Sequence, residues 1–334
     1  MVSSPEGPEF RMIETNGIRL RAAMAGEGPL VVLVHGFPES WAAWRHQIGP
    51  IAKAGFKVCA IDCRGYGGSD KPHPVEAYDL ESMTADIAGV VAAEGGGAPG
   101  VLIGHDWGAY LVWNTALLHP DGIRAVAGLS VPFMGVSERT LIDALKPVYA
   151  DRGKFFYQDY FQAPGVAEAE AEADLGAFVR RFYFWLAGEA PDGLGDNRPA
   201  SARVLDGLPD PQPFPGWMTE KDIAYLVSEF RQSGLRGPLN RYRNQHRDVA
   251  FMTPWRGRQI QQPALYIGGA RDVVLSMVPG LDMIAAMRAN VPHLTDAVIL
   301  EGCGHWTQQE RPEEVTAALV NWLKSLPDER WPGK

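Results

Sequence analysis

Short apolar segments alternate with longer segments of helical spacing through the first 130 residues, and this alternation restricts the possible folds more than any other feature. Each apolar run is as long as one strand, and runs that are apolar throughout are typical of strands covered on both faces. Strands separated by helices form βαβ units, in which neighbouring strands are parallel. The sequence therefore predicts a mostly parallel sheet, with strands at Leu30–His35, Lys57–Asp62, Gly100–His105 and Ala125–Ser130.

The same pattern returns near the end of the chain, so the sheet resumes after an interruption. Further strands are predicted at Pro263–Gly268 and Ala297–Glu301, followed by an amphipathic helix at Pro312–Leu326. The more polar segment Met12–Met24, ahead of the first buried strand, has the pattern of an antiparallel hairpin.

The interruption, about Phe133–Phe251, has helical patterns and little strand signal. One apolar helix face is formed by Leu175, Phe178, Val179, Phe182, Tyr183 and Leu186. A Pro/Gly-rich loop at Gly188–Gly216 divides the region. We interpret it as a helical lid at residues 134–250, inserted into an α/β core that consists of residues 1–133 and 251–334.

Composition narrows the choice of partners and compartment. The chain has 31 basic and 40 acidic residues, a formal charge of −9, which disfavours nucleic acid and anionic membranes as partners. No apolar run approaches the ~20 residues that a membrane span needs, and the N-terminal MVSSPEGPEF lacks the pattern of a secretory signal. Three cysteines, Cys59, Cys63 and Cys303, suit a reducing compartment. We therefore expect a cytoplasmic protein.

The most informative motif lies between Val101 and Ala109. An apolar strand leads into Gly-His-Asp106-Trp-Gly, and a helical pattern follows. Glycines on both sides of a central residue are typical of a nucleophile elbow, a sharp turn that holds the central side chain above the sheet. An ordinary strand-to-helix turn, with Asp106 capping the helix, is the alternative.

The acidic residue at the centre of the motif predicts the class of reaction. A serine that attacked a saturated carbon would form an ether, which is hard to cleave, whereas a carboxylate forms an ester that water can hydrolyse. Asp106 therefore indicates displacement at an sp³ carbon rather than hydrolysis of an acyl substrate.

Hydrolysis of such an ester needs a base and a group that orients the base. His305 follows the last predicted strand and Asp272 follows the strand before it, so nucleophile, acid and histidine occur in the order expected of this architecture. A purely structural histidine, and an Asp272 that only caps a helix or forms a turn, are the alternatives. Three other acidic residues lie near in sequence: Asp282, Asp296 and Glu301.

Two neighbouring side chains are given lesser roles. Cys303 could form a dyad with His305, but Asp106 already occupies the position of the nucleophile. His105, beside the elbow, is interpreted as packing at the end of a strand.

A tight turn at His35–Glu39 supplies an oxyanion hole in this scheme. Its glycine and proline would direct the backbone N–H of Phe37 to the space above Asp106, where the N–H of Trp107 joins it. A plain turn is the alternative.

Together these motifs resemble the α/β-hydrolase epoxide hydrolases. The similar segments are HGFPESW at 35–41, RGYGGSDKP at 64–72, GHDWGA at 104–109 and GCGHW at 302–306, and they extend to two lid segments, 155–168 and 239–244. The resemblance implies an α/β-hydrolase fold with an inserted helical cap. It also implies that each lid segment contributes one tyrosine directed at the substrate, here Tyr157 and Tyr242.

The tyrosine pair suits the chemistry that the resemblance implies. Ring opening of an epoxide expels an alkoxide, and a phenol remains protonated at neutral pH yet can donate its proton as charge develops. Packing within the lid is the alternative for both residues, and Tyr160 lies close enough in sequence to be confused with Tyr157.

The resemblance implies that epoxides are hydrolysed to vicinal diols with no metal or organic cofactor. The expected partners are a small hydrophobic epoxide, suggested by the aromatic lid, and water; the oligomeric state stays open, with a homodimer among the options. A haloalkane or haloacid dehalogenase would share the Asp nucleophile. Haloalkane dehalogenases, however, carry Asn in place of Phe37, and fluoroacetate dehalogenases carry Arg in place of Trp107. A ligand receptor without catalysis is a further alternative.

Overall fold

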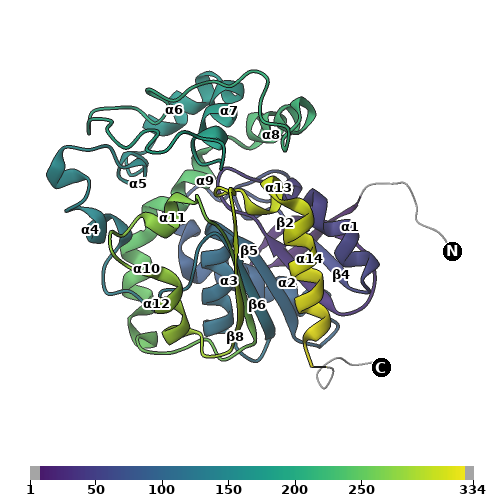
Figure 1. Ribbon diagram of the computed structural model, residues 1–334. Helices are drawn as coiled ribbons and strands as arrows, with labels where there is room; N and C mark the ends of the chain where they lie inside the picture. Colours follow the sequence, from purple (N-terminus) through teal and green to yellow (C-terminus); the bar gives the residue numbers. More distant parts are fainter. Residues whose placement is uncertain (1–7, 328–334) are drawn as a thin grey trace.

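The computed structural model describes residues 8–327 and contains one eight-stranded sheet with helices on both faces and a helical cap above it (Figure 1). Residues 1–7 carry most of the N-terminal segment considered for a secretory signal, so that expectation lies largely outside the described residues. No helix within residues 8–327 is long and apolar enough to cross a bilayer.

The sheet has the strand order β1-β2-β4-β3-β5-β6-β7-β8. β1 and β2 form an antiparallel hairpin, β2 also pairs antiparallel with β4, and all remaining pairs are parallel. The predicted hairpin and mostly parallel sheet are confirmed. The strands are β1 (Glu9–Thr15), β2 (Ile18–Ala25), β3 (Leu30–Val34), β4 (Lys57–Ile61), β5 (Gly100–His105), β6 (Ile123–Leu129), β7 (Ala264–Gly269) and β8 (Leu294–Leu300).

Helices of the core cover the two faces of the sheet. They are α1 (Arg45–Lys53), α2 (Leu80–Glu94), α3 (Trp107–Leu118), α11 (Val273–Ser276), α12 (Met283–Asn290), α13 (Thr307–Glu310) and α14 (Pro312–Ser325), with 3₁₀ turns η1 (Trp41–Trp44) and η2 (Val75–Tyr78). Alternate residues of a strand point to opposite faces: Val32 and Val34 pack with α2 and α3, whereas Val31 and Leu33 pack with α1 and α14. The apolar runs are therefore buried on both sides, as predicted.

The segment between β6 and β7 is helical, as predicted, and much of it lies above the sheet in Figure 1. Its helices are α4 (Leu141–Leu145), α5 (Tyr157–Tyr160), α6 (Val166–Ala173), α7 (Leu175–Trp185), α8 (Glu220–Ser233), α9 (Arg236–Asn240) and α10 (Gln245–Met252), with 3₁₀ turns η3 (Ala150–Arg152), η4 (Arg241–Asn244) and η5 (Thr253–Trp255). The predicted apolar helix face is α7, although the helix ends one residue before Leu186. Between α7 and α8 the chain has no regular helix or strand. One residue of this segment, Pro199, forms an isolated bridge with Lys154.

The start of α3 lies very close to β3, and this approach requires a glycine. A Cβ atom at Gly108 would be 2.1 Å from the carbonyl oxygen of Val34. Backbone atoms cannot move aside as a flexible side chain would, so the first turn of α3 can reach its place beside β3 only without a side chain at this position. The helix that begins with the elbow is thereby fixed against the centre of the sheet.

We expect Gly108→Ala to lower the free energy of unfolding by about 1–3 kcal/mol, the range for overpacked sites. The matched control is Gly216→Ala, because nothing lies within 4 Å of a Cβ at Gly216; its effect should stay within about 0.5 kcal/mol. Urea titrations of both variants measure the difference. Equal stability of the two variants would contradict the close packing of α3 on β3.

Candidate active site

Asp106 occupies the sharp turn between β5 and α3. Its backbone has φ 54° and ψ −120°, a conformation that L-residues rarely adopt and that is often found at functional sites. The turn is held by hydrogen bonds from Asp106 N to Leu129 O and from Tyr110 N to Asp106 O. The side chain does not cap α3, so the helix-cap interpretation is wrong, and the carboxylate is directed elsewhere.

Asp106, His305 and Asp272 form a continuous chain of polar contacts. Asp106 Oδ2 lies 3.3 Å from His305 Nε2, and His305 Nδ1 lies 3.0 and 3.1 Å from the two oxygens of Asp272. His305 and Asp272 are each only 2% exposed. The structure thus brings together the three residues expected from the sequence, which follow the ends of β5, β7 and β8 in the sheet.

Asp272 also performs the capping function considered as its alternative. Its Oδ1 accepts a hydrogen bond from Val274 N at the start of α11 while contacting His305. Among the other acidic candidates, Asp282 caps α12, and Asp296 and Glu301 are exposed. The cap fixes the carboxylate beside the imidazole.

The charges of these groups shift their pKa values in opposite directions. Burial by itself would raise the pKa of Asp106, but the hydrogen bond and charge of His305, with a smaller contribution from the Phe37 amide, hold it below its usual value. Burial by itself would lower the pKa of His305, yet Asp272 and Asp106 raise it well above its usual value. At neutral pH the resting site therefore favours a carboxylate next to an imidazolium.

One of the two expected oxyanion donors contacts the carboxylate directly. Phe37 N donates to Asp106 Oδ1 over 2.8 Å. Trp107 is the first residue of α3, so its N–H is one of the free amides at the helix start; within residues 8–327, no hydrogen bond joins it to Asp106. Of the two amides, only that of Phe37 donates a hydrogen bond to the Asp106 carboxylate.

Tyr157 and Tyr242 come from separate parts of the cap and line the same pocket as Asp106 and His305. Their ring centroids are 6.0 Å apart. Burial raises the pKa of both phenols, and the Asp106 charge raises it further. The nearby Tyr160 is occupied elsewhere, because its hydroxyl donates to Glu170 over 2.7 Å.

The remaining pocket lining is largely apolar and aromatic. Three aromatic residues of the cap line the pocket: Phe155, Phe182 and Trp185. Phe161 instead packs against Phe37 and Tyr242, and Trp217 packs against Phe214. Val273, Val274 and Met277 add an aliphatic side next to Asp272.

Comparison with known proteins identifies the family. The alpha/beta hydrolase fold family matches residues 29–312. Epoxide hydrolase A of Mycobacterium tuberculosis is 41% identical over 96% of this chain and 98% of its own length. The chain belongs to the α/β-hydrolase-fold epoxide hydrolases. The predicted fold class and family resemblance are confirmed.

Solved structures of the same family have closely similar backbone folds. An epoxide hydrolase from an endophytic Streptomyces has a TM-score of 0.91 at 44% identity, with 96% of each chain covered. Epoxide hydrolase A from Mycobacterium thermoresistibile has a TM-score of 0.89 at 43% identity, with 96% of this chain and 99% of that chain covered. Bifunctional epoxide hydrolase 2 of Sus scrofa is 42% identical over 92% of this chain, which spans only 54% of that relative.

Two buried residues next to this epoxide hydrolase site, Glu39 and His105, make contacts that the sequence did not predict. His105 Nδ1 contacts Glu39 Oε2 and His105 Nε2 contacts the His305 carbonyl, each over 2.8 Å. The side chains of both residues are fully buried. His105 is packed at the end of β5, as interpreted from the sequence. In addition it contacts partners that are 66 and 200 residues away, which the sequence did not predict.

Glu39 is the centre of this buried group of hydrogen bonds. Besides His105, it accepts from the Gly36 amide and from the side-chain amides of Gln308 and Gln309. These three amide donors, with the His105 ring beside them, compensate the cost of burying the carboxylate. The arrangement joins the turn that carries Phe37 to the loop that carries His305.

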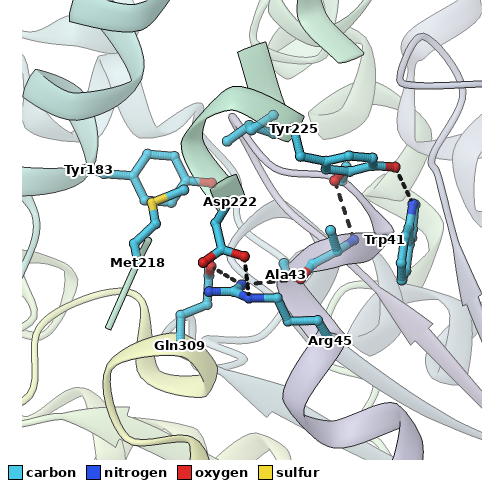
Figure 2. A pocket seen from close by; sticks show the side chains of 11 residues that line it. Trp41, Ala43, Arg45, Tyr183, Met218, Asp222, Tyr225 and Gln309 are labelled. Atoms are coloured by element: carbon cyan, nitrogen blue, oxygen red, sulfur yellow. Dashed lines mark hydrogen bonds and ion pairs between the residues drawn. The ribbon is translucent and has the colours of Figure 1, made fainter. Parts of the chain in front are cut away.

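A second cavity lies on the seam between the core and α8 (Figure 2). Arg45 crosses it: Nε lies 3.1 Å from Asp222 Oδ1, and Nη1 donates to Gln309 Oε1 over 2.7 Å. On the other side, Trp41 Nε1 donates to the hydroxyl of Tyr225 over 2.7 Å. Because these polar atoms are already paired, we interpret the seam as a contact that holds the cap on the core.

Cys303 does not form a dyad with His305. It is fully buried, its Sγ contacts the Gly304 carbonyl, and burial raises the pKa of the thiol. Within residues 8–327, no group of three His, Cys, Asp or Glu side chains is arranged to hold a metal ion.

The charge of Asp106 should be measurable through His305. Asp106→Asn removes one of the two anions beside the imidazole, so the pKa of His305 should fall; an NMR titration of the ring checks this. Asp282→Asn is the control, because Asp282 caps α12 and should leave the pKa unchanged. A pKa that stays constant or rises in Asp106→Asn would contradict the electrostatic coupling.

Proposed function

We propose that this enzyme converts epoxides to vicinal diols through an ester between the substrate and Asp106. The observation that carries the proposal is the placement of a paired carboxylate opposite two phenols in one aromatic pocket. The carboxylate is a nucleophile for a saturated carbon, and the phenols are proton donors for the oxygen that this attack expels.

In the first half-reaction, Asp106 attacks a ring carbon while Tyr157 and Tyr242 hydrogen-bond the ring oxygen. The new C–O bond to the carboxylate forms as the ring C–O bond breaks, and one phenol transfers its proton to the departing alkoxide. Burial and the Asp106 charge raise the pKa values of both phenols, so both hold their protons at neutral pH until the alkoxide develops. General-acid assistance of this kind contributes roughly 10²–10⁴ in rate.

In the second half-reaction, water hydrolyses the ester on Asp106. Esterification removes the Asp106 charge that raises the pKa of His305. The imidazolium can then give up its proton, which through solvent restores the phenol that donated its proton in the first half-reaction. The neutral imidazole acts as a base for the attacking water, while Asp272 keeps the ring oriented. The Phe37 amide, already directed at Asp106 Oδ1, and the Trp107 amide would stabilise the tetrahedral oxyanion. Release of the diol regenerates the carboxylate.

The names of the relatives support the same reaction. Epoxide hydrolase A of Mycobacterium tuberculosis and the Streptomyces structure carry the name of this activity and match almost the whole chain. The aromatic lining by Phe155, Phe182 and Trp185 favours a small hydrophobic epoxide.

A dehalogenase would use the same nucleophile but needs a different partner for the leaving group. A departing halide requires N–H donors and no proton, whereas the carboxylate here faces two phenols. Phe37 also stands where haloalkane dehalogenases carry Asn, and Trp107 stands where fluoroacetate dehalogenases carry Arg. These features favour the epoxide over the halide.

His305→Gln should stop the second half-reaction after the first has occurred. Incubation with an epoxide should leave an adduct of the substrate's mass on the peptide that contains Asp106, detectable by mass spectrometry. The double variant Asp106→Asn/His305→Gln is the control and should carry no adduct. An adduct on any other peptide would refute Asp106 as the nucleophile.

Tyr157→Phe combined with Tyr242→Phe should slow formation of the ester by roughly 10²-fold or more, because both proton donors are lost. Tyr160→Phe is the matched control, since that hydroxyl contacts Glu170. Single-turnover kinetics with enzyme in excess measure the step. Near-normal ester formation in the double variant would exclude the acid role.

A further inference from the structure

One of the two phenols of the pocket, Tyr157, has a buried side-chain amide next to its hydroxyl group. Gln158, next to Tyr157 on α5, turns its side-chain amide back so that Nε2 donates to the Tyr157 hydroxyl oxygen over 2.9 Å. Gln158 is only 5% exposed. None of the roles assigned above accounts for this buried amide beside a proposed proton donor.

The orientation of that amide is decided by atoms outside the pocket. Leu141 N, at the start of α4, can only donate, and it donates to Gln245 Oε1 over 3.1 Å. The opposite end of the Gln245 amide is therefore Nε2, which donates to Gln158 Oε1 over 2.9 Å. Gln158 Nε2 is then the end left to face Tyr157.

A second acceptor supports the same orientation of Gln245. Its Nε2 also lies 3.4 Å from the Tyr242 carbonyl, which can only accept. A reversed Gln245 would place its oxygen against this carbonyl and its amide nitrogen against Leu141 N. Leu141 N would then face a donor and the Tyr242 carbonyl would face an acceptor, so both hydrogen bonds from Gln245 would be lost.

We propose that Gln158, held by Gln245, is a positioning residue that directs the proton of Tyr157 toward the substrate. The Tyr157 hydroxyl has one proton. Because its oxygen accepts the Gln158 N–H, the O–H does not donate to that amide. The proton is available to the ring oxygen in the pocket. This inference rests on the proposed acid role of Tyr157.

The same contact assists the phenol after the proton has left. Burial and the Asp106 charge disfavour a phenolate at Tyr157 and raise its pKa, and the Gln158 hydrogen bond acts in the opposite direction. An N–H donor beside the developing negative charge stabilises the transition state more than the ground state. Gln158 therefore acts on ester formation and not on ester hydrolysis.

Two substitutions at Gln158 remove the donor in different ways. Gln158→Glu keeps the size but leaves only acceptors when ionised, so the Tyr157 proton turns toward the new carboxylate; Gln158→Met removes the donor without adding charge. We expect each to slow ester formation by roughly 10-fold, part of what general-acid catalysis contributes. Hydrolysis of the ester should stay within about twofold. Gln212→Glu, at an exposed lid position, controls for added charge and should change neither step.

Gln245→Glu tests whether Gln245 sets the orientation of the Gln158 amide, and it leaves Tyr157 itself unchanged. Its ionised carboxylate would accept from Leu141 N and from Gln158, so the Gln158 amide reverses and presents its oxygen to Tyr157. Ester formation should slow as in Gln158→Glu. Thermal unfolding of all variants separates this effect from loss of the fold.

The deciding measurement is a double-mutant cycle in single turnovers, with ester formation and decay followed by mass on the Asp106 peptide. In a Tyr157→Phe background, Gln158→Met should cause no further slowing, because the phenol on which it acts is gone. Additive effects, or equal slowing of both half-reactions, would overturn the positioning role and leave the proposed function intact. Unchanged ester formation in Tyr157→Phe itself would instead overturn the acid role, and this inference with it.

Discussion

The contact between the Asp106 carboxylate and the His305 imidazole is the interaction on which the rest of the site depends. A buried carboxylate is unfavourable unless it is paired, and here the imidazole and the Phe37 amide hold it in its charged form. The backbone conformation at φ 54° places this charge at the end of β5. Together with Asp272, the same charge raises the pKa of His305, so in the proposed reaction this contact would set both the nucleophile and the timing of the base.

The core and the cap supply different parts of the chemistry. Strand ends of the sheet carry the proposed nucleophile, base and orienting acid, whereas the cap carries both phenols and the aromatic lining. The two layers are joined by the Arg45–Asp222 ion pair and by the hydrogen bond from His305 N to Leu186 O. Since the phenols face Asp106 only when the cap is seated, these contacts matter for function as well as for stability.

Much of this arrangement could be predicted from local sequence. The apolar runs predicted the strands because buried parallel strands are apolar on both faces, and the glycines around Asp106 predicted the elbow. Long-range contacts between polar side chains that belong to no recognised motif could not be predicted. Glu39 with His105, and Gln245 with Gln158, are pairs 66 and 87 residues apart whose polar side chains match no periodic pattern. Tyr157 was separable from Tyr160 only through the family resemblance.

The covalent ester on Asp106 is the central claim, and the fate of oxygen atoms tests it most directly. A single turnover is run with excess unlabelled enzyme in water whose oxygen is a heavy isotope. The diol should then carry an unlabelled new oxygen, which comes from Asp106. The heavy oxygen should appear in the carboxyl group of the Asp106 peptide. Heavy oxygen delivered directly into the diol, with none in that peptide, would contradict the account.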